Sequence, residues 1–302
     1  MTLSDRPTPP AGSTSRTCPA ALAGRRILFI GGGNMAAAMI GGLVDTGLGA
    51  DQVAVIEPAA AARQALRGKH PALDAFADAG EIGGDACFDA LVLAVKPQQA
   101  SAALAGCRQL LGRLPQALVL SIAAGLSVEL LVAMSGGHRR VIRAMPNTPS
   151  LIGEGIAGLF APGDAEPGDR DIAEAILSAT GQVVRVDQEN LIDTVTAVSG
   201  SGPAYAFYLI EAMTQAGIAG GLDMASARTL ASYTVKGAAL LAIASEEPPE
   251  ILRARVTSPG GTTAAAVAVL DRHEVKASIV EAIGAAALRS RELSDEARAA
   301  LP

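Results

Sequence analysis

The sequence contains no tryptophan, and aromatic residues make up only 3% of its 302 residues. A protein that binds single-stranded nucleic acid by base stacking needs aromatic side chains, so this scarcity argues against such a role. Basic residues are not in excess either, since the net charge is −6 and the isoelectric point about 5.2. The surface therefore offers no general electrostatic attraction to nucleic acid or anionic lipid. We expect neither a nucleic acid nor a membrane among its partners.

Histidine and cysteine, which supply most transition-metal ligands, are also scarce. The chain has three residues of each type, in unrelated contexts and at wide spacings: His70, His138, His273, Cys18, Cys87 and Cys107. We therefore predict no metal site, no disulfide framework and no serine–histidine–aspartate triad. Free cysteines are typical of a reducing compartment, which favours a cytoplasmic protein.

Long apolar runs are missing as well, because charges or glycines interrupt the alanine-rich stretches, so no transmembrane helix is expected. Residues 1–24 are rich in proline, serine, threonine and glycine and lack the apolar core of a signal peptide. We predict a flexible tail there. Half of all residues are hydrophobic and 18% are charged, which is typical of a well-packed globular protein.

From residue 25 to residue 189 the sequence alternates between buried-strand and helix patterns. Strands are predicted at residues 26–30, 53–56, 90–95, 117–122 and 139–145, and a strand–helix–strand unit at 156–186. This alternation predicts an α/β fold with a Rossmann-type, doubly wound parallel sheet. Ligands bind such sheets at the carboxyl ends of the strands.

A glycine-rich turn follows the first strand and opens a helix. In the run from Gly31 to Ala36, Gly31 makes the turn and Gly33 allows a pyrophosphate to approach the backbone, while Ala36 takes the third small position. Because strands flank this unit on both sides, we predict a dinucleotide-binding loop.

Glu57 ends the second strand, where a carboxylate would accept hydrogen bonds from the adenosine ribose hydroxyls. A 2′-phosphate would face like charge there, which favours NADH over NADPH. Arg63, one turn into the next helix, offers a compensating positive charge. The choice between the two cofactors therefore stays open.

Three further segments follow predicted strands and are expected to line the same cleft. They are Lys96-Pro97, Ala123-Ala124-Gly125 and Pro146-Asn147-Thr148-Pro149. The two prolines around Asn147 and Thr148 restrict the backbone, so that polar side chains and carbonyls there can face a nicotinamide ring.

From residue 190 to residue 302 strand patterns disappear. Helices are predicted at residues 203–217, 224–245, 249–256, 262–270 and 274–293. The first of these helices is apolar on nearly all sides, and a small helical domain has few places to bury it. We therefore predict an obligate homodimer formed by these helices.

The run Ser258-Pro259-Gly260-Gly261-Thr262-Thr263 directly precedes one of these helices and enters it. A turn that opens a helix leaves several backbone N–H groups unpaired and pointing the same way, which suits a carboxylate or a phosphate. A helix cap is the simpler interpretation of this run alone. The dinucleotide loop earlier in the chain shifts the interpretation toward a ligand site.

Six motifs occur in the order of one known family. They are Ile27–Met35, Ala94–Pro97, Ser121–Gly125, Arg143–Pro149, Ser199–Tyr205 and Ser258–Thr263. Together they closely resemble Δ1-pyrroline-5-carboxylate reductase, the last enzyme of proline synthesis, over residues 26–292. The resemblance implies a Rossmann domain, then an all-α dimerisation domain, and dimers that associate further, often into decamers.

The resemblance also implies a reaction and a site. NADPH or NADH would reduce the C5 imine of L-1-pyrroline-5-carboxylate to give L-proline. The implied cofactor-binding residues are Gly31, Gly33, Asn34, Met35, Ala94, Lys96, Pro97, Ala123, Met145 and Asn147. Glu57 joins them from its place after the second strand, where many members of the family instead have small hydroxyl residues or arginine. The implied substrate-binding residues, supplied by the partner subunit's helical domain, are Ser258, Gly260, Gly261, Thr262 and Thr263. The catalytic candidates are Thr263, at the ring nitrogen, and Lys96.

Two other functions are weighed. A β-hydroxyacid dehydrogenase-like oxidoreductase shares the two-domain plan, but it expects a lysine on the first interdomain helix, and residues 203–218 contain none. Lys236, in a later helix, is interpreted as a solvated side chain. A non-catalytic NAD(P)-binding sensor would not need the Ser258–Thr263 turn.

Overall fold

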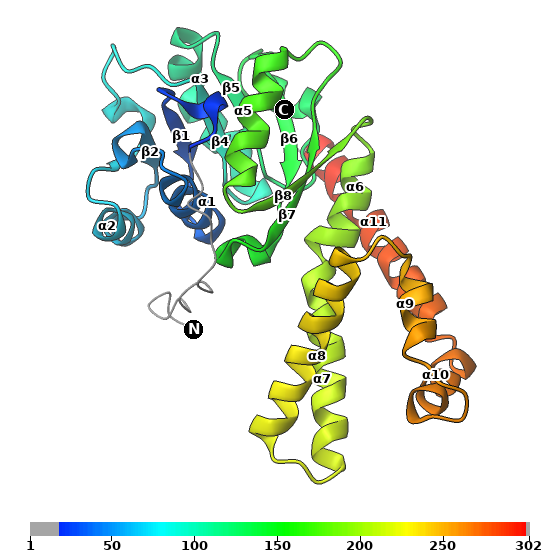
Figure 1. Ribbon diagram of the computed structural model, residues 1–302. Helices are drawn as coiled ribbons and strands as arrows, with labels where there is room; N and C mark the ends of the chain where they lie inside the picture. The colour runs from blue at the N-terminus through cyan, green and yellow to red at the C-terminus, as the bar shows by residue number, and fades with distance from the viewer. Residues whose placement is uncertain (1–17, 300–302) are drawn as a thin grey trace. The chain divides into compact units, whose positions relative to one another are not determined.

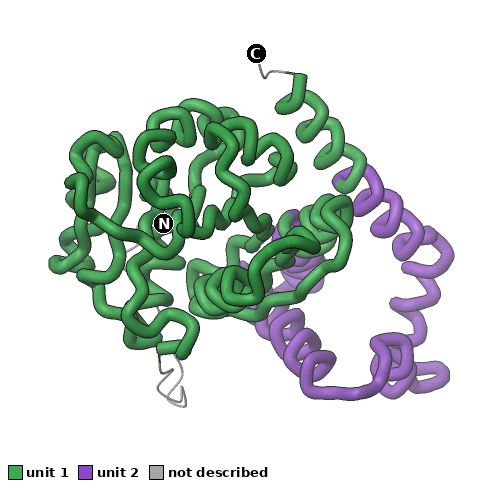
Figure 2. The backbone as a smooth tube through the Cα atoms, turned by 90° about the horizontal axis from the view of Figure 1, so that it is seen from above, with its two compact units in different colours: residues 1–200, 287–302 green, residues 201–286 purple. Residues whose placement is uncertain are grey.

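The computed structural model describes residues 18–299. The chain divides into two units: one runs through Gly200 and resumes at Ala287, and the other spans Ser201–Ala286 (Figure 2). The predicted division at residue 190 falls earlier, before helix α6 (Leu191–Val195) and the π-helix η5 (Thr196–Gly200), which both belong to the first unit. The last helix, α11 (Val275–Ala299), contributes to both units.

The first unit is built on an eight-stranded sheet with the order β3-β2-β1-β4-β5-β6-β7-β8 (Figure 1). Its strands are β1 (Ile27–Ile30), β2 (Val53–Ile56), β3 (Asp74–Phe76), β4 (Ala90–Leu93), β5 (Leu118–Ser121), β6 (Val141–Met145), β7 (Gly155–Phe160) and β8 (Gly181–Val186). All neighbours pair in parallel except β6 and β7. The prediction of a Rossmann-type sheet is therefore confirmed, with one antiparallel pair that it did not foresee.

The antiparallel pair has a simple cause. A parallel connection needs a crossover of a dozen or more residues, usually with a helix. Only residues 146–154 join β6 to β7, and they contain just the short 3-10 helix η4 (Thr148–Ile152). Because α5 (Pro167–Ser178) joins β7 to β8, that pair returns to parallel.

Helices cover both faces of the sheet. Alternate strand residues point to opposite faces, so Phe29 packs in one buried cluster and Leu28 in the other. The first cluster includes residues of α1 (Asn34–Asp45), α2 (Ala60–Lys69) and α5, and the second includes residues of α3 (Pro97–Arg113) and α4 (Val128–Met134). This two-sided burial explains why the strands are continuous apolar runs.

The predicted flexible tail, residues 1–24, lies mostly outside the described residues. Where the structure does describe it, it forms the 3-10 helix η1 (Ala20–Leu22). Leu22 is fully buried in the core cluster that contains α1 and α5. An apolar segment this short has no periodicity, so composition alone could not separate it from a tail.

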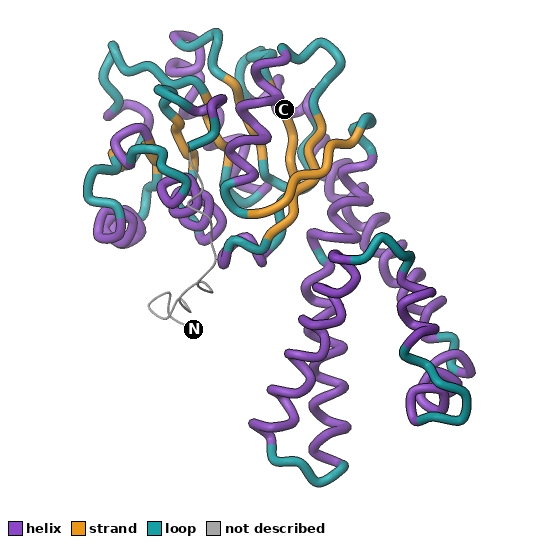
Figure 3. Tube along the Cα trace, in the orientation of Figure 1, coloured by secondary structure: helices purple, strands orange, loops and turns teal. Residues whose placement is uncertain are grey.

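The second unit contains helices only, as predicted (Figure 3). They are α7 (Gly202–Ala219), α8 (Met224–Ala244), α9 (Pro249–Arg255), α10 (Thr262–Arg272) and the first part of α11. Helices α7 and α8 approach closely at small residues, since a Cβ added to Gly217 would lie 3.0 Å from the Ala227 Cβ. No helix in the described part of the chain is both long and apolar enough to cross a membrane.

This unit has almost no core of its own. Of its described residues, only Ala227 and Ala231 are buried. Large apolar side chains instead face outward: Tyr208 is 78% exposed, Ile243 81% and Phe207 65%. A monomeric soluble protein rarely exposes so much apolar surface, which supports the predicted interface between subunits.

Candidate functional site

The predicted cofactor-binding residues of the first unit lie along one edge of the sheet. Strands β1, β2, β4, β5 and β6 are mutually parallel neighbours, so their carboxyl ends share this edge. Gly31 follows β1, Glu57 follows β2, Ala94 follows β4 and Ala123 lies just beyond β5, while Met145 ends β6. Residues distant in the sequence are thus brought to the edge where such sheets bind ligands.

Gly31 is the position where only glycine fits. Its φ is +98°, and a Cβ there would lie 2.9 Å from the Ala94 carbonyl oxygen and 2.7 Å from the Val95 Cγ1. Its N–H donates to the Ile56 carbonyl at 2.8 Å. The turn is thereby packed between the ends of β2 and β4, and the chain passes directly from β1 into α1.

The start of α1 faces open space. Gly33 is the N-cap residue, no side-chain hydrogen bond caps the helix there, and a Cβ added to it would meet nothing within 4 Å. Asn34 is exposed and Met35 half-buried. The first N–H groups of a helix have no partner within the helix and carry partial positive charge, so this end suits a pyrophosphate.

Glu57 is tied to the loop itself. Its carboxylate accepts hydrogen bonds from the Gly32 N–H and the Ala59 N–H, both at 2.8 Å. The Arg63 guanidinium donates to the carbonyls of Glu57 and Pro58 at 2.7 and 2.8 Å. The carboxylate therefore stands beside the glycine turn, with a cation close to the same short segment.

The carboxyl ends of β4 and β5 present mainly backbone groups and small side chains at this edge of the sheet. Ala94 donates its N–H to the Ile30 carbonyl at 2.8 Å, and Ala123 is 6% exposed. Lys96 is the exposed N-cap of α3 and Pro97 its first residue, so the lysine side chain can reach outward from this edge. Proline suits this position because its missing N–H would have no helical partner there.

Sequence reasoning missed the ion pair that anchors β6. Arg143 is 5% exposed and donates to the Glu189 carboxylate at 2.7 Å. The same Glu189 oxygen accepts from the Val128 N–H at 2.7 Å, at the start of α4. An arginine inside the apolar strand Val141–Met145 was the available signal, because a buried charge requires a partner.

In the second unit, the Ser258–Thr263 turn has the expected geometry. Gly260 has φ +72°, and Gly261 donates its N–H to the Ser258 carbonyl at 3.0 Å. Gly261 is the N-cap of α10, where no side-chain hydrogen bond caps the helix. The Thr262 and Thr263 hydroxyls stand at the start of α10, and Thr263 is exposed. The first amides of α10 and these hydroxyls are thus available to an anionic ligand.

The buried cysteine of α3 is chemically inert. Cys107 lies on α3 and is 2% exposed, and burial raises the pKa of its thiol to about 11. A thiol with that pKa is protonated at neutral pH and is not a nucleophile. Among residues 18–299, no three histidine, cysteine or acidic side chains come together in a group that could hold a metal ion.

Comparison with known proteins supports the same assignment over about nine tenths of the chain. Residues 189–293 match the family described as pyrroline-5-carboxylate reductase dimerisation, and residues 26–125 match a family described as NADP oxidoreductase, coenzyme F420-dependent. The pyrroline-5-carboxylate reductase of Pseudomonas aeruginosa is 44% identical over 272 residues, covering 90% of this chain and 97% of the relative. That of Haemophilus influenzae is 40% identical, covering 88% and 97%.

The chain belongs to the pyrroline-5-carboxylate reductase family. A solved reductase structure from Coxiella burnetii superposes with a TM-score of 0.83 at 36% identity, covering 89% of this chain and 98% of that one. The Plasmodium falciparum reductase, solved with NADP bound, superposes with a TM-score of 0.78 at 27% identity, covering 90% and 98%. The resemblance predicted from six motifs is therefore confirmed.

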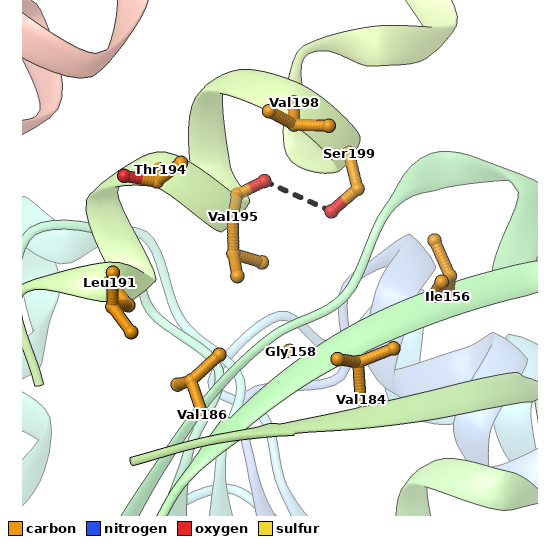
Figure 4. A pocket seen from close by; sticks show the side chains of 9 residues that line it. All are labelled: Ile156, Gly158, Val184, Val186, Leu191, Thr194, Val195, Val198 and Ser199. Carbon is orange, nitrogen blue, oxygen red and sulfur yellow. Dashed lines mark hydrogen bonds between the residues drawn. The ribbon is translucent and has the colours of Figure 1, made fainter. Parts of the chain in front are cut away.

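An apolar groove in the first unit bears on the dimer (Figure 4). It has a volume of about 310 Å³. Side chains of the neighbouring strands β7 and β8 line one side of it, and the α6–η5 segment lines the other. Val184 and Val198, on opposite sides of it, are 50% and 54% exposed. The α6–η5 side falls inside residues 189–293, the part that matches the dimerisation family.

Gly33 provides a direct test of the cofactor loop. Because its φ is −68° and a Cβ would meet no protein atom within 4 Å, Gly33→Ala should fold normally. We expect its dissociation constant for NAD(P)H, measured by calorimetry, to rise at least ~10-fold, since the methyl group blocks close approach of a pyrophosphate.

Gly106→Ala, in the middle of α3, is the matched control because its Cβ also meets nothing within 4 Å. It should leave the dissociation constant unchanged and stabilise the protein by up to ~1 kcal/mol through helix propensity. Equal affinities for wild type and Gly33→Ala would mean that the start of α1 does not bind the dinucleotide.

Proposed function

We propose that this protein reduces L-1-pyrroline-5-carboxylate to L-proline, with NADPH or NADH as hydride donor. The observation that carries the proposal is the 44% identity to a curated reductase across 90% of the chain, together with an intact glycine loop and an intact Ser258–Thr263 turn. These two turns belong to different units, so each is an independent match to the expected chemistry.

The residues present fit a dinucleotide. Gly31 makes the tight turn, and Gly33 leaves open space at the start of α1, where the free helix end suits a pyrophosphate. Lys96, Pro97, Ala94 and Ala123 would border the cofactor farther along the edge, with the segment from Met145 to Thr148 beside the nicotinamide. When bound, NAD(P)H supplies the hydride that the C5 carbon of the imine accepts.

The Ser258–Thr263 turn would hold the substrate carboxylate. Ser258 offers its hydroxyl, and the backbone N–H groups of Gly261 and Thr262 would donate to the carboxylate oxygens, with Gly260 shaping the turn. Thr263 would hydrogen-bond the ring nitrogen. We propose that the turn comes from the helical unit of a second copy, so that each site of the homodimer uses both chains.

The proposed hydride transfer needs little general acid–base catalysis. A protonated imine is already a strong electrophile, so most of the acceleration can come from holding two reactants in the right orientation, worth up to ~7–11 kcal/mol in favourable cases. The chain accordingly has few titratable groups among the proposed site residues: Lys96 and Glu57 lie on the sheet edge, and the turn contributes only hydroxyls and backbone N–H groups. Lys96 would contribute positive charge beside the cofactor.

A homodimer also accounts for the bare apolar surfaces. The helical unit and the groove beside Val184 and Val198 both expose apolar side chains, which a second copy of the chain would bury. Residues 189–293 match the dimerisation family, which supports this arrangement. We propose further association of dimers, up to a decamer, and a cytoplasmic location. Sedimentation measurements distinguish a dimer from a larger assembly.

The two alternative functions, a β-hydroxyacid dehydrogenase and a non-catalytic NAD(P)-binding sensor, fit these residues less well. A β-hydroxyacid dehydrogenase would place its lysine on α7, which has none, and Lys236 lies on α8 with its ammonium 5.8 Å from the Tyr233 ring. A non-catalytic sensor leaves the Ser258–Thr263 turn without a role.

Purified protein should oxidise NAD(P)H when L-1-pyrroline-5-carboxylate is added, and Thr263→Ala should do so more slowly. Loss of a hydrogen bond to a charged group costs about 1.5–3 kcal/mol, so we expect kcat to fall roughly 10- to 100-fold. Thr214→Ala is the control, since its hydroxyl bonds the Ile210 carbonyl within α7. Turnover by wild type with unchanged kcat in Thr263→Ala would remove Thr263 from the mechanism, and no turnover by wild type would refute the proposed function.

Glu57→Ser tests cofactor choice. Removing the carboxylate takes away like charge from the position of a 2′-phosphate and leaves Arg63 nearby, so kcat/KM for NADPH relative to NADH should rise by about 10-fold, a change of ~1.4 kcal/mol. Glu81→Ser is the control, because Glu81 is likewise an acid bonded to a loop N–H, that of Ala77 at 2.7 Å. An equal ratio in wild type and Glu57→Ser would show that Glu57 does not discriminate.

A further inference from the structure

The side-chain amide of Asn147 is hydrogen-bonded to the chain itself at both of its ends. Its Oδ1 accepts a hydrogen bond from the Ile156 N–H at 3.0 Å, and its Nδ2 donates to the Ser199 carbonyl at 3.1 Å. A backbone N–H can only donate and a carbonyl can only accept, so the two partners fix which way the amide points. Asn147 is 8% exposed, and it makes no side-chain cap for η4.

The two partners belong to structurally different neighbours. Ile156 is at the start of β7, in the sheet of the first unit. Ser199 lies in the π-helix η5, the last turn of that unit before α7 begins at Gly202. Single π-helical turns are uncommon in proteins and frequently occur at functional sites. Asn147 therefore joins the end of β6 to a regular strand on one side and to an irregular helical turn on the other.

A second contact joins η5 to the end of β6. A Cβ added to Gly200 would lie 2.8 Å from the Met145 Cε, so η5 packs directly on the last residue of β6. The π-turn is also held internally, because the Ser199 hydroxyl donates to the Val195 carbonyl at 2.9 Å (Figure 4). The segment from Met145 to Asn147 thus contacts η5 at both of its ends, through the Met145 side chain and the Asn147 amide.

We propose that Asn147 is a positioning residue of the reductase rather than a cofactor ligand. Its amide holds the Met145–Thr148 segment against η5, and this sets where that segment can meet the nicotinamide ring. The inference rests on the proposed function, because it assigns a role within that reaction. It replaces direct contact with the cofactor, which the sequence predicted for Asn147, by an indirect role.

Asn147→Asp tests this role with almost no change of shape. The new carboxylate still accepts from the Ile156 N–H, but when ionised it places an oxygen without a proton against the Ser199 carbonyl. We expect kcat/KM for the imine to fall about 10- to 100-fold at pH 8, the range for a buried group that loses its partner. The dissociation constant for NAD(P)H, measured by calorimetry, should stay within ~2-fold of wild type.

The pH dependence separates positioning from a general loss of structure. On protonation the carboxyl introduced by Asn147→Asp regains an O–H donor toward Ser199, so the ratio of variant to wild-type kcat/KM should rise as the pH falls. Asn190→Asp, an exposed position at the start of α6, controls for the added charge and should match wild type throughout. A weakened NAD(P)H affinity that accounts for the whole loss would instead make Asn147 a cofactor ligand.

Gly200→Ala is a second variant, for use if Asn147→Asp does not fold. It alters the contact between η5 and Met145 from the η5 side. The added methyl must displace the flexible end of Met145, so it should lower kcat/KM for the imine while NAD(P)H affinity is kept. Unchanged kcat/KM in a folded Asn147→Asp or Gly200→Ala, with an active wild type, would overturn the inference alone. An inactive wild type would instead refute the proposed function.

Discussion

The close packing of Gly31 against the end of β4 is the constraint on which the rest of the site depends. With φ at +98° and the Ala94 carbonyl 2.9 Å from where a Cβ would be, Gly31 lets the chain turn from β1 into α1 within three residues, 31–33. That turn leaves the start of α1 open at Gly33 and puts the Gly32 N–H within reach of Glu57. A bulkier residue at Gly31 would push the turn outward and change all three features together.

A second constraint acts on the helical unit, which cannot bury its own apolar surface. Its described residues include only two buried side chains, both alanines on α8. Hydrophobic burial is the main favourable contribution to folding, so we expect a second copy to contribute to the stability of this unit. The same dependence makes assembly and catalysis inseparable if the Ser258–Thr263 turn serves the partner's site.

Much of this architecture could be predicted from the sequence, because apolar strand runs, the glycine turn and the Ser258–Thr263 motif are local signals. The features that were missed depend on contacts between distant segments. Strand β3 is only three residues long with one buried residue, and the antiparallel β7 follows from a short connection. The hydrogen bonds of Asn147 to Ile156 and Ser199 have no local signal at all, and the burial of Leu22 within residues 18–24 has none either.

The central claim is that each active site combines the glycine loop of one chain with the Ser258–Thr263 turn of another. To test this, Gly33→Ala and Thr263→Ala chains are mixed in equal amounts, unfolded and refolded together. The rate of NAD(P)H oxidation by the refolded mixture is then compared with that of wild type. Half of the random dimers would carry one chain of each kind, with one intact site of two, so the account predicts about a quarter of wild-type activity. Activity no higher than the mean of the two parents would mean that each site is built from a single chain.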